Sequence, residues 1–193
     1  MTDILPIVAL GRRIMVLGLT NSGKSTLAVA LGRRLELPAI HLDQLRHRPN
    51  TNWEARPDAE FAELHDEAIR GEEWVMDGSY SMVMPQRIAR ATGIIVLTDS
   101  LATRYRRYFA RTLFQRHRAG ALEGGQDSIK WEMIHWLWHT RNSIGKYQQV
   151  AQQSGLPHVF VDGRRALDGL YAQWGLSRPS ASPDPAAGRF PRR

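Results

Sequence analysis

Short apolar runs alternate along the chain with segments of helical periodicity. Five runs are rich in β-branched or aliphatic residues and are typical of buried strands. The segments between them repeat apolar residues every three or four positions, as Leu27, Ala30, Leu31 and Leu35 do. Strands that alternate with helices predict a three-layer α/β/α fold around a five-stranded parallel sheet. The five runs are 14–17, 39–42, 74–76, 94–97 and 158–161.

The later part of the chain is expected to contain two long helices. An Arg-rich one covers 100–118, and an aromatic-rich one covers 128–153. We expect one domain over residues 1–176, with a helical lid at about 100–125. The stretch 177–193 is rich in Pro, Ser, Ala and Arg, which predicts a disordered tail.

Composition narrows the classes of function. The chain of 193 residues has no cysteine, which excludes disulfides and thiolate metal sites. It carries 26 Lys and Arg against 19 Asp and Glu, a net charge of +7, which favours nucleotides or nucleic acid as ligands. No apolar run approaches the roughly 20 residues of a membrane helix. The first residues lack a basic region, so we expect a soluble, cytoplasmic protein without a membrane partner.

A phosphate-binding loop is predicted at 18–26, GLTNSGKST. It fits the pattern G-x-x-x-x-G-K-[ST] and stands between a predicted strand and a predicted helix. The small residues let main-chain amides surround a phosphate, Lys24 reaches the β- and γ-phosphates, and the Ser25 hydroxyl is a Mg²⁺ ligand. The predicted cofactors are ATP and Mg²⁺. The predicted nucleotide-binding residues are Gly18, Asn21, Ser22, Gly23, Lys24, Ser25 and Thr26.

Two carboxylates follow predicted strands. Ligands in open parallel sheets lie beyond the carboxyl ends of the strands. Asp77 is predicted to share the Mg²⁺ site with Ser25; the alternative is a turn residue in an Asp-Gly pair. Asp43 is predicted to orient an acceptor hydroxyl, to act as its base or to share the Mg²⁺ shell; the alternative is a helix N-cap.

The segments GLTNSGKST, HLD, WVMDGSY, the Arg-rich helix and VDG together resemble one family. It is the nucleoside-monophosphate-kinase group of P-loop NTPases, and within it the adenylate-kinase-like bacterial topology modulation (FlaR-like) proteins. The resemblance covers about 12–165 and implies a P-loop fold and transfer of the γ-phosphoryl of Mg·ATP to a small, nucleotide-like acceptor. It implies that Arg107 and Arg111 are lid arginines that stabilise the transferred group. The implied catalytic residues are Lys24, Asp43, Asp77, Arg107 and Arg111.

The resemblance is incomplete on the acceptor side. Adenylate kinases usually have Phe-Pro-Arg after the Asp-Gly pair, where this chain has Ser79, Tyr80 and Ser81. The arginine that would bind the acceptor's phosphate is therefore missing at that place, and Arg87 and Arg90 are the nearest substitutes. Both a nucleotide and a nucleoside or related small molecule stay open as acceptors.

A second hypothesis comes from the segment 104–118. It contains six arginines and no acidic residue, with Tyr105, Tyr108, Phe109 and Phe114 between them. This pattern is also typical of nucleic-acid binding. The alternative function is an ATP-switched, nucleic-acid-binding regulatory protein that affects DNA topology.

Two further patterns are set aside. LEGGQ at 122–126 is similar to an ABC-transporter signature but lacks the strand that should follow it. His135 and His139 have the i, i+4 spacing of a metal pair, but core or interface packing is the simpler interpretation.

Overall fold

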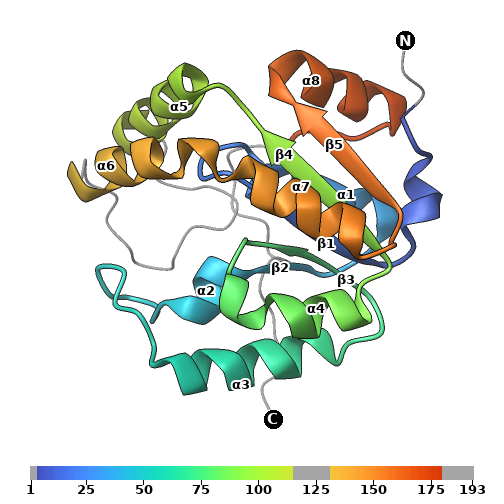
Figure 1. Ribbon diagram of the computed structural model, residues 1–193, viewed down its shortest axis with the longest axis horizontal. Helices are drawn as coiled ribbons and strands as arrows, with labels where there is room; N and C mark the ends of the chain where they lie inside the picture. Colours follow the sequence, from blue (N-terminus) through green and yellow to red (C-terminus); the bar gives the residue numbers. More distant parts are fainter. Residues whose placement is uncertain (1–3, 115–130, 180–193) are drawn as a thin grey trace.

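The computed structural model describes residues 4–114 and 131–179, and its centre is a parallel sheet with the strand order β2-β3-β1-β4-β5 (Figure 1). All four neighbouring pairs of strands are parallel. The strands are β1 (Arg13–Gly18), β2 (Ala39–His41), β3 (Trp74–Asp77), β4 (Gly93–Thr98) and β5 (His158–Asp162). The five predicted runs are confirmed, each to within one residue at its ends.

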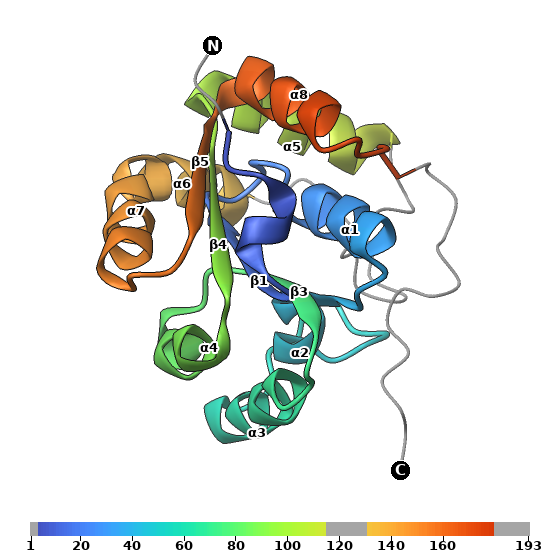
Figure 2. The ribbon, with the colours of Figure 1, turned by 90° about the vertical axis from the view of Figure 1, so that its right-hand side faces the viewer.

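Helices cover both faces of the sheet, which confirms the three-layer α/β/α prediction. Figure 2 shows α1 and α8 on one side and α4 and α7 on the other. The α-helices are α1 (Lys24–Leu35), α2 (Leu42–Arg46), α3 (Asp58–Ile69), α4 (Met84–Arg90), α5 (Leu101–Phe114), α6 (Trp131–His139), α7 (Ile144–Gln153) and α8 (Gly163–Gln173). Short 3-10 turns cover Ile7–Leu10, Ser81–Val83 and Thr140–Asn142.

The alternation of side chains along the central strand divides the core in two. Ile14 and Val16 of β1 belong to the cluster that includes α1 and α8. Met15 and Leu17 belong to the cluster that includes α3, α4 and α7. Because β1 is buried on both faces, its sequence is continuously apolar, as expected for the centre of a parallel sheet.

The register of the strands brings the predicted site residues to one edge. Asp77 at the end of β3 lies beside Val16 on β1 and beside His41 on β2. Gly18 at the end of β1 lies beside Leu97 on β4. The phosphate loop and the residues that follow β2 and β3 therefore emerge from the same edge of the sheet.

The single long helix predicted over 128–153 is wrong. Its described part consists of α6, the turn Thr140–Asn142 and α7. The break falls on Thr140, Asn142 and Ser143, whose side chains compete for backbone hydrogen bonds and favour helix ends. Arg141 donates to the carbonyl of Trp138 at 2.9 Å and so satisfies one of the last carbonyls of α6.

The short helix α2 was not predicted. The sequence pattern indicated only a strand and then a polar connection, because five residues are too few to show a helical period. Part of the predicted lid, LEGGQ and the tail from residue 180 onward lie outside the described residues. Arg178 was assigned to the tail, but it pairs with Asp168 and lies over the Tyr171 ring, both on α8. Within the described ranges, every helix is too short or too polar to cross a membrane.

Candidate active site

The phosphate loop turns closely against the neighbouring strand. A Cβ atom on Gly18 (φ 140°) would lie 2.0 Å from the Leu97 carbonyl oxygen, so only glycine fits at this position. The Leu19 amide donates to the same carbonyl at 3.3 Å, and the Ser22 amide donates to Leu19 at 3.2 Å. Gly23 has a φ of 101° and places the chain at the start of α1. The loop is thus shaped by main-chain contacts at the two predicted glycines.

The start of α1 is suited to an anion. Its first turn contains no acidic residue, and no side chain in the described part of the protein caps it. Its amides and the positive end of its dipole therefore favour a negatively charged ligand. Lys24 is the first residue of α1, and its Nζ donates to the Leu19 carbonyl at 2.9 Å, across the loop. The ammonium therefore lies at the loop, where a phosphate would bind.

Ser25, Asp77 and His41 form a buried chain of contacts behind the loop. Ser25 Oγ donates to Asp77 Oδ2 at 2.6 Å, and His41 Nδ1 lies 2.5 Å from Asp77 Oδ1. Asp77 and His41 are 5% and 3% exposed. This burial and these contacts favour the interpretation of Asp77 as a metal-site residue over its interpretation as a turn residue. A hydroxyl beside a carboxylate also provides the oxygen ligands that Mg²⁺ prefers, so Ser25 and Asp77 fit the predicted metal.

The opposite charges of Asp77 and His41 favour the ionised form of each side chain. Burial by itself raises the pKa of Asp77, but the charge of His41 and the hydrogen bonds from His41 and Ser25 outweigh burial and bring the pKa below its ordinary value. Burial lowers the pKa of His41, but the Asp77 carboxylate outweighs this effect and raises the pKa above its ordinary value. His41 was not identified from the sequence. The available signal was its place at the end of a strand, one residue before the start of α2.

Asp43 lies on α2 and contacts the loop that follows β3. The Tyr80 hydroxyl donates to Asp43 Oδ1 at 2.7 Å, and the Tyr80 ring packs against Phe61 with centroids 5.1 Å apart. The N-cap alternative for Asp43 is wrong, because His41 occupies the N-cap position and Asp43 is inside the first turn. Burial, followed by the Asp43 carboxylate, raises the pKa of Tyr80 far above its ordinary value. Tyr80 therefore stays protonated and remains a hydrogen-bond donor.

Arg87 supports this loop from within the core. It is fully buried; its Nη1 donates to the Gly78 carbonyl at 2.8 Å and its Nη2 to the Tyr80 carbonyl at 3.3 Å. Burial lowers the pKa of Arg87 to about 10. Arg90 donates to the Arg70 carbonyl, at the end of α3 and the opposite edge of the sheet. Neither arginine is therefore available to an acceptor. The structure does not support either one as a substitute for the missing phosphate-binding arginine.

Ser79 connects the acceptor side to the phosphate loop. Its hydroxyl accepts a hydrogen bond from the Gly18 amide and donates one to the Gly18 carbonyl, each at 3.1 Å. Sequence reasoning noted Ser79 only as a departure from a family pattern. This contact joins residues 61 positions apart, and no local signal in the sequence indicates it.

The arginines of α5 contact the main chain of the phosphate loop. Arg104 is 1% exposed and donates through Nε to the Thr20 carbonyl at 2.8 Å. Arg107 Nη1 donates to the Ser22 carbonyl at 3.0 Å and lies 2.9 Å from Asp99 Oδ2. Arg111 belongs to α5, but its side chain lies outside the described residues. In this conformation Arg104 and Arg107 fix the loop through its carbonyls.

The same contacts bear on the nucleic-acid hypothesis. The structure describes the side chains of three of the six arginines in 104–118. Arg104 and Arg107 donate to the phosphate loop, and Arg106 is exposed. Arg116 and Arg118 lie outside the described residues. The described part of α5 therefore presents little of the basic surface that this hypothesis needs.

His135 and His139 are exposed on α6, with ring centroids 4.4 Å apart. No third metal-ligating side chain joins them within the described part of the chain. The metal interpretation that was set aside gains no support.

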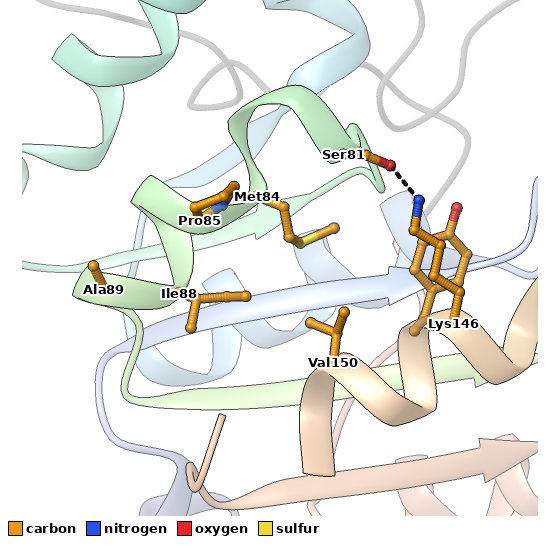
Figure 3. A pocket seen from close by; sticks show the side chains of 8 residues that line it. Ser81, Met84, Pro85, Ile88, Ala89, Lys146 and Val150 are labelled. Carbon is orange, nitrogen blue, oxygen red and sulfur yellow. Dashed lines mark hydrogen bonds between the residues drawn. The ribbon is translucent and has the colours of Figure 1, made fainter. Parts of the chain in front are cut away.

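A pocket of about 520 Å³ lies between α4 and α7. Figure 3 shows Lys146 and Ser81 at one end of it, joined by a hydrogen bond of 2.9 Å. The lining is mostly apolar and includes Met84, Ile88 and Val150. Neither Asp43 nor Tyr80 lines this pocket, but Ser81, which directly follows Tyr80, does.

Comparison with solved structures found distant likenesses. A shikimate kinase from Bacteroides thetaiotaomicron has 17% identity and a TM-score of 0.48, over 86% of this chain and 99% of that one. A gluconokinase from Sinorhizobium meliloti has 18% identity and a TM-score of 0.48, over 86% and 95%. A putative kinase from Chloroflexus aurantiacus has 17% identity and a TM-score of 0.48, over 84% and 95%.

Other comparisons found no match, either among protein-family models or among curated proteins. The structural likenesses are too distant to carry an argument about reaction or substrate. The chemistry of this chain is therefore argued from its own residues.

Proposed function

We propose that this protein is a P-loop phosphotransferase that moves the γ-phosphoryl group of ATP, with Mg²⁺, to a small acceptor. One observation carries the proposal. The Ser25 hydroxyl lies 2.6 Å from the buried Asp77 carboxylate, beside Lys24 and the uncapped start of α1. This combination provides a phosphate cradle, a cation and an oxygen-ligand pair at one point.

Each residue has a distinct part. The loop amides and Lys24 bind the β- and γ-phosphates, and Ser25 with Asp77 holds the metal. Mg²⁺ bound there would neutralise part of the negative charge on the phosphates. Asp43 faces the acceptor and accepts the proton of its hydroxyl. Positioning and charge suffice for phosphoryl transfer, so no covalent intermediate on the enzyme is required.

The arginines of α5 act in one of two ways. The family resemblance predicts that Arg107 and Arg111 stabilise the transferred group. The contact of Arg107 with Asp99 and the Ser22 carbonyl supports a role in fixing the loop, from which the side chain would have to turn to meet the γ-phosphoryl group. Likewise, the adenylate-kinase-like subtype and the FlaR-like relationship are predictions from the sequence. The expected acceptor from that relationship is a nucleotide or nucleoside.

The test is a binding and turnover experiment on the full chain. Calorimetry should detect Mg·ATP, and EDTA should weaken the binding. ADP release should then be screened with nucleoside monophosphates, nucleosides and small polyols, with mass spectrometry to identify the phosphorylated product. A protein that ignores Mg·ATP under these conditions would end the proposal. Tight DNA binding with a steep salt dependence and no acceptor-stimulated ADP would favour the regulatory alternative instead.

A further inference from the structure

The charges around Asp43 and Tyr80 indicate which acceptors fit there. Phosphate groups on ligands are recognised mainly by arginine, whose guanidinium donates two parallel hydrogen bonds. A nucleoside monophosphate acceptor therefore requires an arginine on the acceptor side that is available to it. Four arginines lie near this side in the described residues, on α2, α4 and the connection 47–57. They are Arg46, Arg48, Arg56 and Arg87.

Two of these arginines are paired with acidic side chains. Arg46 Nη1 donates to Asp58 Oδ1 at 2.6 Å, and its guanidinium lies 5.4 Å from the Phe61 ring centre. Arg48 Nη2 donates to Glu60 Oε2 at 2.9 Å. Both arginines are therefore engaged by carboxylates, and the Glu60 carboxylate also accepts from Arg56.

The other two arginines are fixed by the main chain. Arg56 donates to the Leu45 carbonyl at 2.9 Å and to Glu60 Oε1 at 3.0 Å, and so ties the connection to the end of α2. Arg87 donates to the carbonyls of Gly78 and Tyr80 and has no exposed surface. Both arginines therefore stabilise the backbone of the acceptor side instead of facing a ligand.

Asp43 places a negative charge on the exposed surface of α2. Asp43 is exposed, and its Oδ1 accepts from the Tyr80 hydroxyl. An exposed carboxylate in this position is able to accept a hydrogen bond from a hydroxyl group of a ligand. A carboxylate repels a phosphate dianion at contact distance, even in water. An outward carboxylate with committed arginines around it therefore selects against phosphate and in favour of an alcohol.

We infer that the acceptor is a small, phosphate-free alcohol, a class that includes nucleosides and excludes nucleoside monophosphates. This inference rests on the proposed function and narrows its substrate. One hydroxyl donates to Asp43 Oδ2, and the Tyr80 hydroxyl keeps the carboxylate in position. The alcohol oxygen forms the new bond to the γ-phosphorus. The bond from that phosphorus to its bridging oxygen breaks, ADP leaves with the electron pair, and the proton goes to Asp43.

Matched pairs of acceptors test the inference. ADP release by the full chain with Mg·ATP would be measured with adenosine and AMP, cytidine and CMP, glucose and glucose 6-phosphate, and glycerol and glycerol 3-phosphate. We expect the phosphate-free member of at least one pair to be the substrate, with kcat/KM about tenfold or more above its phosphorylated partner. Preference for the phosphorylated members, or no response to any phosphate-free member, would overturn it.

A binding measurement makes the test independent of turnover. Calorimetry in the presence of Mg·ADP would compare AMP and glucose 6-phosphate on the wild type and on Asp43→Asn. Removing the repelling charge should tighten binding of the phosphorylated compounds by about fivefold. Unchanged or weaker binding would contradict the inference.

Glu72→Gln provides the matched control. It makes the same change from carboxylate to amide at an exposed residue before β3, at the opposite edge of the sheet, and it should leave both the acceptor preference and the affinity for phosphorylated compounds unchanged. Failure of the proposed function looks different from failure of the inference. In the first case the wild type does not bind Mg·ATP at all; in the second it binds Mg·ATP and prefers a phosphorylated acceptor.

Discussion

The donor side and the acceptor side of the candidate site are built in different ways. The donor side is built on one continuous stretch, Gly18 to Ser25, whose shape follows from two glycines and the start of a helix, and Asp77 joins it from the end of β3. The acceptor side joins α2, the loop 78–81 and Arg87 of α4 through contacts between distant residues. A local motif therefore defines the donor side, and the tertiary structure defines the acceptor side. Mutations should separate the two.

The largest effect is expected on the donor side, from Lys24→Ala. Removing the ammonium takes away charge stabilisation at the transferred phosphoryl group, and turnover should fall by about 10²–10³-fold or more. The fold should remain intact, because the Lys24 ammonium donates to a main-chain carbonyl of the phosphate loop, that of Leu19. ADP release and circular dichroism would be measured together. Full turnover in this variant would refute the role of the loop.

Arg87→Met should damage the acceptor side while sparing the donor side. The substitution removes the donors to the buried carbonyl of Gly78 and the part-buried carbonyl of Tyr80, and a buried carbonyl left unsatisfied costs about 1–3 kcal/mol. We expect thermal unfolding to shift down by several degrees. The variant should still bind Mg·ATP at a temperature where it is folded.

The comparison would be sharpened by Arg87→Lys, which keeps the charge but lacks the forked geometry. It should recover only part of the lost stability. If Arg87→Met abolished Mg·ATP binding in a folded protein, the two sides would not be separable.

His41→Gln tests the buried pair through its pH dependence. The pKa of Asp77 is lowered by folding, so its contribution to stability is present above its ordinary pKa of about 4 and is lost as pH falls. The pKa of His41 is raised, so its contribution is present below its ordinary pKa of about 6.5 and is lost as pH rises through the folded value. The stability advantage of the wild type over the variant should therefore be greatest between about pH 4 and 6.5 and should shrink above that range.

Chemical denaturation of both proteins at a series of pH values would measure this difference. An advantage that stays constant from pH 5 to 9 would show that the contact stabilises the protein without a charge.

Ser79 connects the two sides, and Ser79→Ala should have the smallest effect on Mg·ATP binding and stability. It removes two hydrogen bonds to Gly18, worth about 1 kcal/mol each in net stability. Because Gly18 begins the phosphate loop, the affinity for Mg·ATP should fall a few-fold. Ser79→Thr keeps the hydroxyl and is the control. Equal affinities for the wild type and Ser79→Ala would mean that the sides are independent at this point.

The sequence was sufficient for the sheet and for the donor side. The strands and the loop around Lys24 and Ser25 are determined by residues that are close together in the sequence. A short segment of sequence is therefore enough to predict them. The pairing of Ser25 with Asp77 could also be expected, because both follow strands that end at one edge.

The acceptor side could be predicted only in part. Asp43 was found by its position after a strand, but its partner Tyr80 and the support from Arg87 depend on how α2, α3 and α4 pack. His41 could not be recognised either, because a histidine in a strand gives no sign of the carboxylate it meets. The break between α6 and α7 was missed because an aromatic-rich helical period continues across it.

The contacts from α5 to the phosphate loop have a consequence for how the chain can vary. Arg104 and Arg107 donate to carbonyl oxygens of Thr20 and Ser22, which every amino acid possesses. These hydrogen bonds would therefore survive replacement of either loop side chain. The attachment of the helix therefore does not depend on the side chains at these two positions, whereas replacing either arginine would remove its own hydrogen bond to the loop.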